Sequence, residues 1–304
     1  MNNKNTLTKK KNEIRVSQQW HDVINAFTQR KLAVIGLIIF LFLLLIALFA
    51  PIIAPHDPTN QELMDAYKPP SWQDGGSPEY LFGTDNFGRD ILSRLLYGGR
   101  VSISAAGFAS IFSMIFGVMI GIIAGYFGGK IEDILMRFVD IFLSFPMVLI
   151  ALALASIVGP SFRNIVLIMA LTGWMTYART IASTTKTIRT REFVDAAVSI
   201  GAPTHRILIH HILPNVITPA LVLFTFGFAQ FIILESALSY LGLGVPPPMP
   251  TWGRMLYDAR AYMRIAPWMM LAPGTAIMLV TLSLNFIGDG LRDSLDPRTR
   301  SQVR

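Results

Sequence analysis

Long apolar stretches separated by polar connections dominate the pattern of this chain. Six stretches contain no Asp, Glu, Lys or Arg: residues 32–56, 101–129, 141–162, 164–178, 207–234 and 265–288. Five of them exceed the roughly 20 residues that an α-helix needs to cross a hydrocarbon core of about 30 Å. The pattern therefore predicts an all-α membrane protein with six transmembrane helices.

The fourth stretch is the weakest of the six. It has 15 residues between Arg163 and Arg179, so it spans only if both arginines extend their charges to opposite interfaces. The charge distribution favours keeping it, because six spans place 18 Lys and Arg in cytoplasmic segments and 8 in external ones. Without it, 159–215 becomes one external loop and the arginine-rich C-terminus lies outside. We therefore expect six spans with both termini in the cytoplasm.

These spans divide the chain into five segments. They are a cytoplasmic N-terminal tail (1–31), a first transmembrane helix (32–53), an external loop (54–100), a five-helix core (101–290) and a cytoplasmic C-terminal tail (291–304). The first helix is expected to be retained, because Pro51 disfavours signal cleavage after Ala50. The external loop is too long for a simple connector, so it either carries function or folds as a cap over the helix ends.

Three glycines in the second span are candidates for helix packing. Gly117, Gly121 and Gly125 recur every four residues, and small residues at this spacing let a neighbouring helix approach closely in lipid. In the third span we expect Pro146 to bend the helix. Arg137 and Asp140, three residues apart, are expected to pair at its cytoplasmic end.

The cytoplasmic loop 183–215 contains a short amphipathic segment, EFVDAAVSI at 192–200. Helical spacing places two sets of side chains on opposite faces: apolar Phe193, Ala196, Ala197 and Ile200, and polar Glu192, Asp195 and Ser199. Gly201 predicts the end of this helix, and Thr204 predicts a short second helix that ends before Pro214.

This segment allows three interpretations. A helix on the membrane surface is disfavoured, because its polar face carries two acids and no Lys or Arg. It is either a connector helix packed within this protein or a helix that docks into a groove of a partner protein. We prefer the docking interpretation.

Composition narrows the function further. Hydrophobic residues make up 52% and charged residues 15%, against about 25% charged in soluble domains. The absence of cysteine excludes disulfides and thiolate sites. The net charge of +7 lies beside apolar runs and forms no stripe, so we expect no nucleic-acid binding.

No pattern in the sequence indicates catalysis. HExxH and GxSxG motifs are missing, and His210 and His211 are adjacent, so on a helix they point about 100° apart. We therefore expect no catalytic residue, no metal site and no nucleotide-binding motif in this chain. Glu235 is the one acid set in an apolar run, with a capping or interface role favoured over a role in a transport path.

Three longer stretches carry a family resemblance. EFVDAAVSIGAPTHRILIHHILPN at 192–215 resembles the "EAA" loop of permease subunits of bacterial binding-protein-dependent ABC importers. FGTDNFGRDILSRLLYGGRVSI at 82–103 and LSYLGLGVPPPMPTWGRML at 238–256 resemble the C-type permease subunit of dipeptide, oligopeptide and nickel importers. The likeness extends from about residue 30 to residue 300.

The resemblance implies a type I ABC importer permease fold in the bacterial cell membrane. It also implies a transmembrane permease that forms half of a peptide translocation pore, together with a homologous second permease. Two cytoplasmic ATPase subunits that bind ATP and Mg, and an external substrate-binding protein, complete the expected complex. ATPase coupling is then expected at Glu192, Phe193, Asp195, Ala196, Ala197, Ile200 and Gly201.

One rival hypothesis remains open at this point. A secondary transporter or channel subunit would work without an ATPase. Such carriers usually need ionisable groups near the bilayer midplane, and five of the six spans have none there. This absence disfavours the rival.

Overall fold

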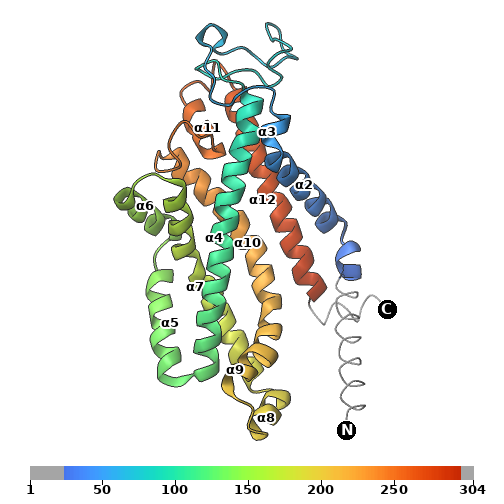
Figure 1. The fold of residues 1–304 in the computed structure, drawn as a ribbon, viewed down its shortest axis with the longest axis vertical. Helices are drawn as coiled ribbons and strands as arrows, with labels where there is room; N and C mark the ends of the chain where they lie inside the picture. Colours follow the sequence, from blue (N-terminus) through green and yellow to red (C-terminus); the bar gives the residue numbers. More distant parts are fainter. Residues whose placement is uncertain (1–23, 296–304) are drawn as a thin grey trace.

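A computed structural model describes residues 24–295 as an elongated bundle of helices (Figure 1). Irregular backbone at 54–90, here called the cap, covers one end of the bundle, and helix α8 lies at the opposite end. The greater part of the expected N-terminal tail, residues 1–23, and residues 296–304 lie outside the described residues.

Within residues 24–295, five helices are long and apolar enough to cross a membrane. They are α2 (Lys31–Leu48), α4 (Ile91–Phe127), α7 (Phe162–Arg189), α10 (Leu213–Tyr240) and α12 (Trp268–Leu295). A sixth span arises if α5 (Gly129–Leu143) and α6 (Met147–Val158) count as one broken span. The short fourth stretch of the sequence lies inside α7, because that helix continues through Arg163 and Arg179 to a length of 28 residues.

The third predicted span is broken, not merely bent. Helices α5 and α6 meet at 84° across a short break that ends at Pro146, so the bend predicted there is present. The predicted pairing of Arg137 with Asp140 is wrong. Asp140 instead forms an ion pair with Arg179, because α5 packs along α7 and brings the two side chains together.

Three helix boundaries differ from the sequence-based ones. Helix α4 begins at Ile91, inside the predicted external loop, because the Asp90 carboxylate caps it by accepting the Ser93 N–H at 2.8 Å. Helix α12 continues to Leu295, beyond the predicted start of the C-terminal tail. The third difference concerns the short helix that directly precedes α10.

The short helix predicted after Gly201 does not end before Pro214. Helix α9 (Thr204–Ile207) runs through a π-helical turn, η2 (Leu208–Ile212), directly into α10. Pro214 lies in the first turn of α10 and has no N–H to donate, and the π-helical turn directly before it keeps the chain helical.

Helix α4 is the central element of the bundle. It packs most extensively against α7 and also contacts α10 and α2, while α2 lies along α12 (Figure 1). The cap contains η1 (Leu63–Asp65), and α11 (Trp252–Ala259) lies beside the cap and packs on α10 and α12. The short α3 (Ala50–Ile53) links α2 to the cap.

Candidate functional site

Helix α8 (Glu192–Ser199) forms the end of the molecule farthest from the cap (Figure 1). Its inner side carries Val194 and Ala197, whose side chains are 1% and 6% exposed. They pack in an apolar cluster with Ile188, Ile207 and Ile212 of the neighbouring helices. The helix is therefore held firmly on the body of the protein by one side.

The other side of α8 is open to solvent. Phe193 and Ala196 are exposed, and Ile200 directly after the helix is 84% exposed. Glu192, Asp195 and Ser199 are exposed as well. The sequence pattern placed four residues on one apolar face, but only Ala197 of these is buried. The other buried residue of α8 is Val194, which the pattern did not place on that face.

Gly201 ends α8 with a left-handed backbone. Its φ is +76°, and the N–H groups of Gly201 and Ala202 donate to the carbonyls of Val198 and Ala197 at 2.9 and 3.1 Å. A Cβ at this position would meet no atom within 4 Å. Glycine is therefore required there by backbone conformation and not by space.

The three glycines of α4 lie against α7. A Cβ on Gly117, Gly121 or Gly125 would come within 2.3–2.8 Å of backbone or Cβ atoms of α7. The nearest of these for Gly121 are the Ile181 Cβ at 2.7 Å and the Ala178 carbonyl oxygen at 2.8 Å. The row thus permits backbone contact between the two most extensively packed helices of this chain.

Replacing Gly121 with leucine is expected to destabilise this chain itself. The added side chain must separate α4 from α7, and overpacking of this kind costs about 1–3 kcal/mol or more. We expect a lower thermal unfolding midpoint of the purified protein in detergent. The control is Gly274→Leu on α12, because a Cβ on Gly274 meets no atom within 4 Å and its backbone φ is not positive. Equal midpoints for the two variants would contradict the packing role.

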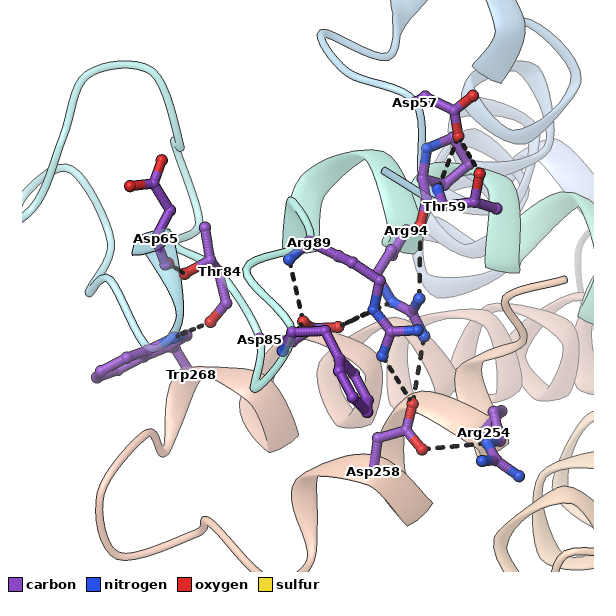
Figure 2. Close-up of polar contacts among 12 residues, drawn as sticks. Asp57, Thr59, Asp65, Thr84, Asp85, Arg89, Arg94, Arg254, Asp258 and Trp268 are labelled. Atoms are coloured by element: carbon purple, nitrogen blue, oxygen red, sulfur yellow. Dashed lines mark hydrogen bonds and ion pairs between the residues drawn. The ribbon is translucent and has the colours of Figure 1, made fainter. Parts of the chain in front are cut away.

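Five charged side chains join the cap to the bundle (Figure 2). Asp85 Oδ2 accepts from Arg89 Nε at 2.6 Å and lies 3.4 Å from Arg94 Nε. Asp258 Oδ2, on α11, lies 3.2 Å from Arg89 and 3.4 Å from Arg94, and its Oδ1 accepts from Arg254 Nε at 3.1 Å. Each carboxylate thus bridges at least two guanidinium groups.

The network is largely removed from solvent. The side chains of Arg94 and Asp85 are 3% and 5% exposed, and that of Asp258 is 11% exposed. Its charges connect the cap, the first turns of α4 and α11. The sequence reading missed this set, because Asp258 lies far from the cap residues along the chain.

Hydrogen bonds fix the rest of the cap. Trp268 Nε1 donates to the Thr84 carbonyl at 3.1 Å, and the Thr84 hydroxyl donates to the Asp65 carbonyl (Figure 2). Hydrogen bonds from Lys68 and Tyr80 hold the pKa of the Asp65 carboxyl below its ordinary value. Burial, followed by the hydrogen bond to Asp65, raises the pKa of Tyr80. The predicted external loop is therefore a folded cap tied to α12.

Glu235 lies at a junction of three helices. Its fully buried carboxylate accepts from the Ser102 hydroxyl of α4 at 2.9 Å and from the Ser239 hydroxyl at 2.7 Å. Ser102 Oγ in turn accepts the Trp252 N–H of α11 at 3.3 Å. These contacts favour the interface role over a transport-path role. Within residues 24–295, no cluster of His, Cys, Asp and Glu is arranged to hold a metal ion.

Comparison with known protein families shows which family this chain belongs to. Residues 117–301 match the family described as "binding-protein-dependent transport system inner membrane component". The chain belongs to this family. The matched range contains the glycine row, the loop with α8, and the helices α7, α10 and α12. Residues 18–70 of the permease also match the N-terminal transmembrane domain of oligopeptide transport permease C.

Curated relatives of the permease are similar over nearly their whole length. A dipeptide transport system permease protein DppC from Alkalihalophilus pseudofirmus is 43% identical over 93% of this chain and 91% of the relative. DppC from Haemophilus influenzae is 40% identical over 90% of this chain and 93% of the relative. A glutathione transport system permease protein GsiD from Escherichia coli is 38% identical over 94% of this chain and 92% of the relative.

A solved structure supports the fold of the permease. A chain of the inward-facing MetNI methionine ABC transporter superposes with a TM-score of 0.57 and 14% identity. The match covers 68% of this chain and 98% of that chain. The protein is therefore an all-α, multi-span permease component of a binding-protein-dependent ABC importer with the type I permease fold. This finding weighs against the rival of a transporter that works without an ATPase.

Proposed function

We propose that this permease forms one half of a translocation path for peptides and that α8 transmits the movement of ATPase subunits to it. The other half of the path is a homologous second permease. Two separate ATPase subunits bind and hydrolyse ATP with Mg, and an external binding protein delivers the peptide. Peptide cargo is supported by the relatives, whose names are dipeptide and glutathione permeases.

One observation carries the coupling role. Helix α8 is anchored by Val194 and Ala197, yet it leaves Phe193 and Ile200 exposed at the tip of the molecule. Val198 at the same tip is 53% exposed as well, and a group of exposed apolar side chains favours a protein partner, since such anchors fill pockets of a partner groove. ATP binding can shift the permease between two states only through contacts that differ between these states. Because α8 is anchored to the bundle, a movement of a bound ATPase subunit would move the bundle with it.

The proposal places the cap outside the cell and α8 in the cytoplasm, in accordance with the 18 to 8 distribution of Lys and Arg. The chain has no cysteine, so single cysteines report their own position. Asp74→Cys, in the cap, is expected to react with an impermeant maleimide in intact cells with a permeabilised outer envelope. Lys130→Cys, exposed in the first turn of α5 at the same end as α8, is expected to react only after lysis. The reverse pattern would overturn this orientation.

Uptake into proteoliposomes tests the transport function. The complete importer, reconstituted with its binding protein, is expected to accumulate radiolabelled dialanine only when ATP is enclosed with the ATPase subunits. Collapse of the proton gradient by an uncoupler should leave this uptake unchanged. Uptake driven by a proton gradient without ATP would contradict the proposal and restore the secondary-transporter hypothesis.

A further inference from the structure

A cavity of about 300 Å³ lies halfway along the length of the bundle, away from α8 and from the cap. Its walls come from α7 and α10, with Met147 at the start of α6 and Asn285 of α12 at its margins. Thr176 marks its level at the middle of the 28-residue helix α7. The cavity therefore lies at a depth where a lipid-facing surface would be apolar throughout.

Small residues and aromatic rings form the floor of this cavity. A Cβ on Gly173 would lie 2.2 Å from the Phe231 ring, and a Cβ on Gly227 would lie 2.6 Å from the Tyr177 hydroxyl. That hydroxyl donates to the Leu223 carbonyl at 3.2 Å, so its hydrogen-bonding capacity is directed into the wall. The floor is closed, and the cavity opens toward the outer surface of this chain, where Thr176 and Gln230 are exposed.

Two carboxamide side chains face this space without partners. Gln230 is exposed and Asn285 is half-buried, and neither side chain forms a hydrogen bond with any residue in 24–295. Each carboxamide offers two N–H donors and one carbonyl acceptor. Placing such groups in hydrocarbon without partners costs several kcal/mol each, so this side of the bundle requires water or a polar ligand and not lipid tails.

We propose that this cavity is the section of the translocation path that the chain contributes, and that Gln230 and Asn285 hydrogen-bond to the main-chain amides of the passing peptide. The inference rests on the proposed peptide cargo. A carboxamide presents the same donor and acceptor groups as a peptide bond, so it pairs with the main chain whatever the side chains are. The surrounding Phe226, Phe231 and Met147 accommodate apolar side chains.

The cavity has no charged lining residue, which suits a path that lets peptides pass better than a site that binds them tightly. Its lining contains no Asp, Glu, Lys, Arg or His. A fixed charge would bind peptides of opposite charge and repel those of like charge, whereas neutral amide groups hold each peptide weakly and release it. The path is therefore expected to distinguish peptides little by their side chains.

Cysteine labelling tests whether the cavity contains water. In the complete importer in proteoliposomes, Gln230→Cys and Asn285→Cys are expected to react with N-ethylmaleimide at least about tenfold faster than Ile38→Cys, since only hydrated thiols form the reactive thiolate. Ile38 lies on α2 and is 61% exposed, so it serves as the control that faces lipid. Reaction of both cavity cysteines no faster than that of the control would overturn the path and indicate a surface covered by the second permease or by lipid.

Uptake by variants tests the contact with the peptide main chain. Gln230→Leu and Asn285→Leu are each expected to lower the uptake of dialanine and of dilysine by about five- to tenfold, the factor for one lost hydrogen bond. ATP hydrolysis stimulated by the loaded binding protein should persist, which shows that the complex is intact. Thr275→Val, at an exposed site of α12 outside the cavity, should leave uptake unchanged.

The outcomes separate this inference from the proposed function. Unchanged uptake in both leucine variants, or loss for only one of the two peptides, would overturn the main-chain contact. If the unmodified importer takes up neither peptide, the proposed cargo is wrong and the main-chain contact falls with it. The labelling result would then still report whether the cavity is part of a hydrated path.

Discussion

Replacing Gly201 with valine is expected to abolish the stimulation of ATP hydrolysis by the loaded binding protein, while the permease still inserts into the membrane. Gly201 has a φ of +76°, a conformation that a β-branched residue strongly disfavours, and such strain costs about 1–3 kcal/mol. The chain relieves it by changing the turn after α8, which re-aims Phe193 and Ile200. Measurement of ATP hydrolysis by the reconstituted importer checks this result.

Two matched variants separate local re-aiming from general strain. Gly201→Asn should retain most of the stimulation, because asparagine adopts the left-handed conformation more readily and the site has open space for a side chain. Gly159→Val carries at least as much strain, because Gly159 has a φ of +85° and a ψ of 167°, again with no atom within 4 Å of its Cβ, but it lies between α6 and α7, away from α8. Loss of stimulation in Gly159→Val equal to that in Gly201→Val would contradict a specific role of α8.

Glu192→Ala provides a graded comparison within the same helix. Glu192 is the first residue of α8 and is exposed, so its charge interacts favourably with the helix N-terminus by about 0.3–1 kcal/mol. Its removal leaves the turn at Gly201 intact. We therefore expect only weakened stimulation, a smaller effect than that of Gly201→Val.

Replacing Asp258 with alanine is expected to destabilise the protein by about 3–5 kcal/mol, the cost of breaking a buried ion pair by removing one partner. The change removes the ion-pair partner of Arg254 and leaves Asp85 as the one remaining carboxylate of the network beside Arg89 and Arg94. Arg94, 3% exposed, then retains a buried charge with little compensation. The thermal unfolding midpoint of the purified permease should fall accordingly.

An exposed carboxylate provides the control for this measurement. Asp133 lies on α5 and is exposed, so Asp133→Ala should change the stability by no more than about 0.5 kcal/mol. Similar midpoints for Asp258→Ala and Asp133→Ala would show that the cap is held by other contacts. The comparison thus isolates the contribution of burial to the network.

Local sequence spacing was enough to predict the spans, the glycine row and the position of α8, because each depends on residues that lie close together along the chain. Gly117, Gly121 and Gly125 recur every four residues, and the turn at Gly201 follows an amphipathic segment directly. Hydropathy also detected the apolar part of α7, although its helix extends through Arg163 and Arg179. The local pattern therefore located the membrane-spanning part and the amphipathic segment that forms α8.

The features that the sequence did not reveal depend on contacts between distant residues. Asp140 pairs with Arg179 on another helix and not with Arg137 three residues away. Asp258 joins the cap although it lies on α11, and Ala197 turns inward because Val194 packs beside it on α7 and α9. Helical periodicity gives the faces of a helix, but the direction in which a face points is set by its neighbours.

A photo-cross-linking measurement tests the coupling role of α8 most directly. A benzophenone amino acid replaces Ile200, the most exposed apolar side chain at the tip, in the assembled importer, and the product is identified by mass spectrometry. The same probe at exposed Leu171 of α7 serves as the control. We expect an adduct with an ATPase subunit at position 200 and none with that subunit at position 171. Adducts at position 200 with lipid alone, in an importer that hydrolyses ATP and takes up peptide, would contradict the proposed coupling.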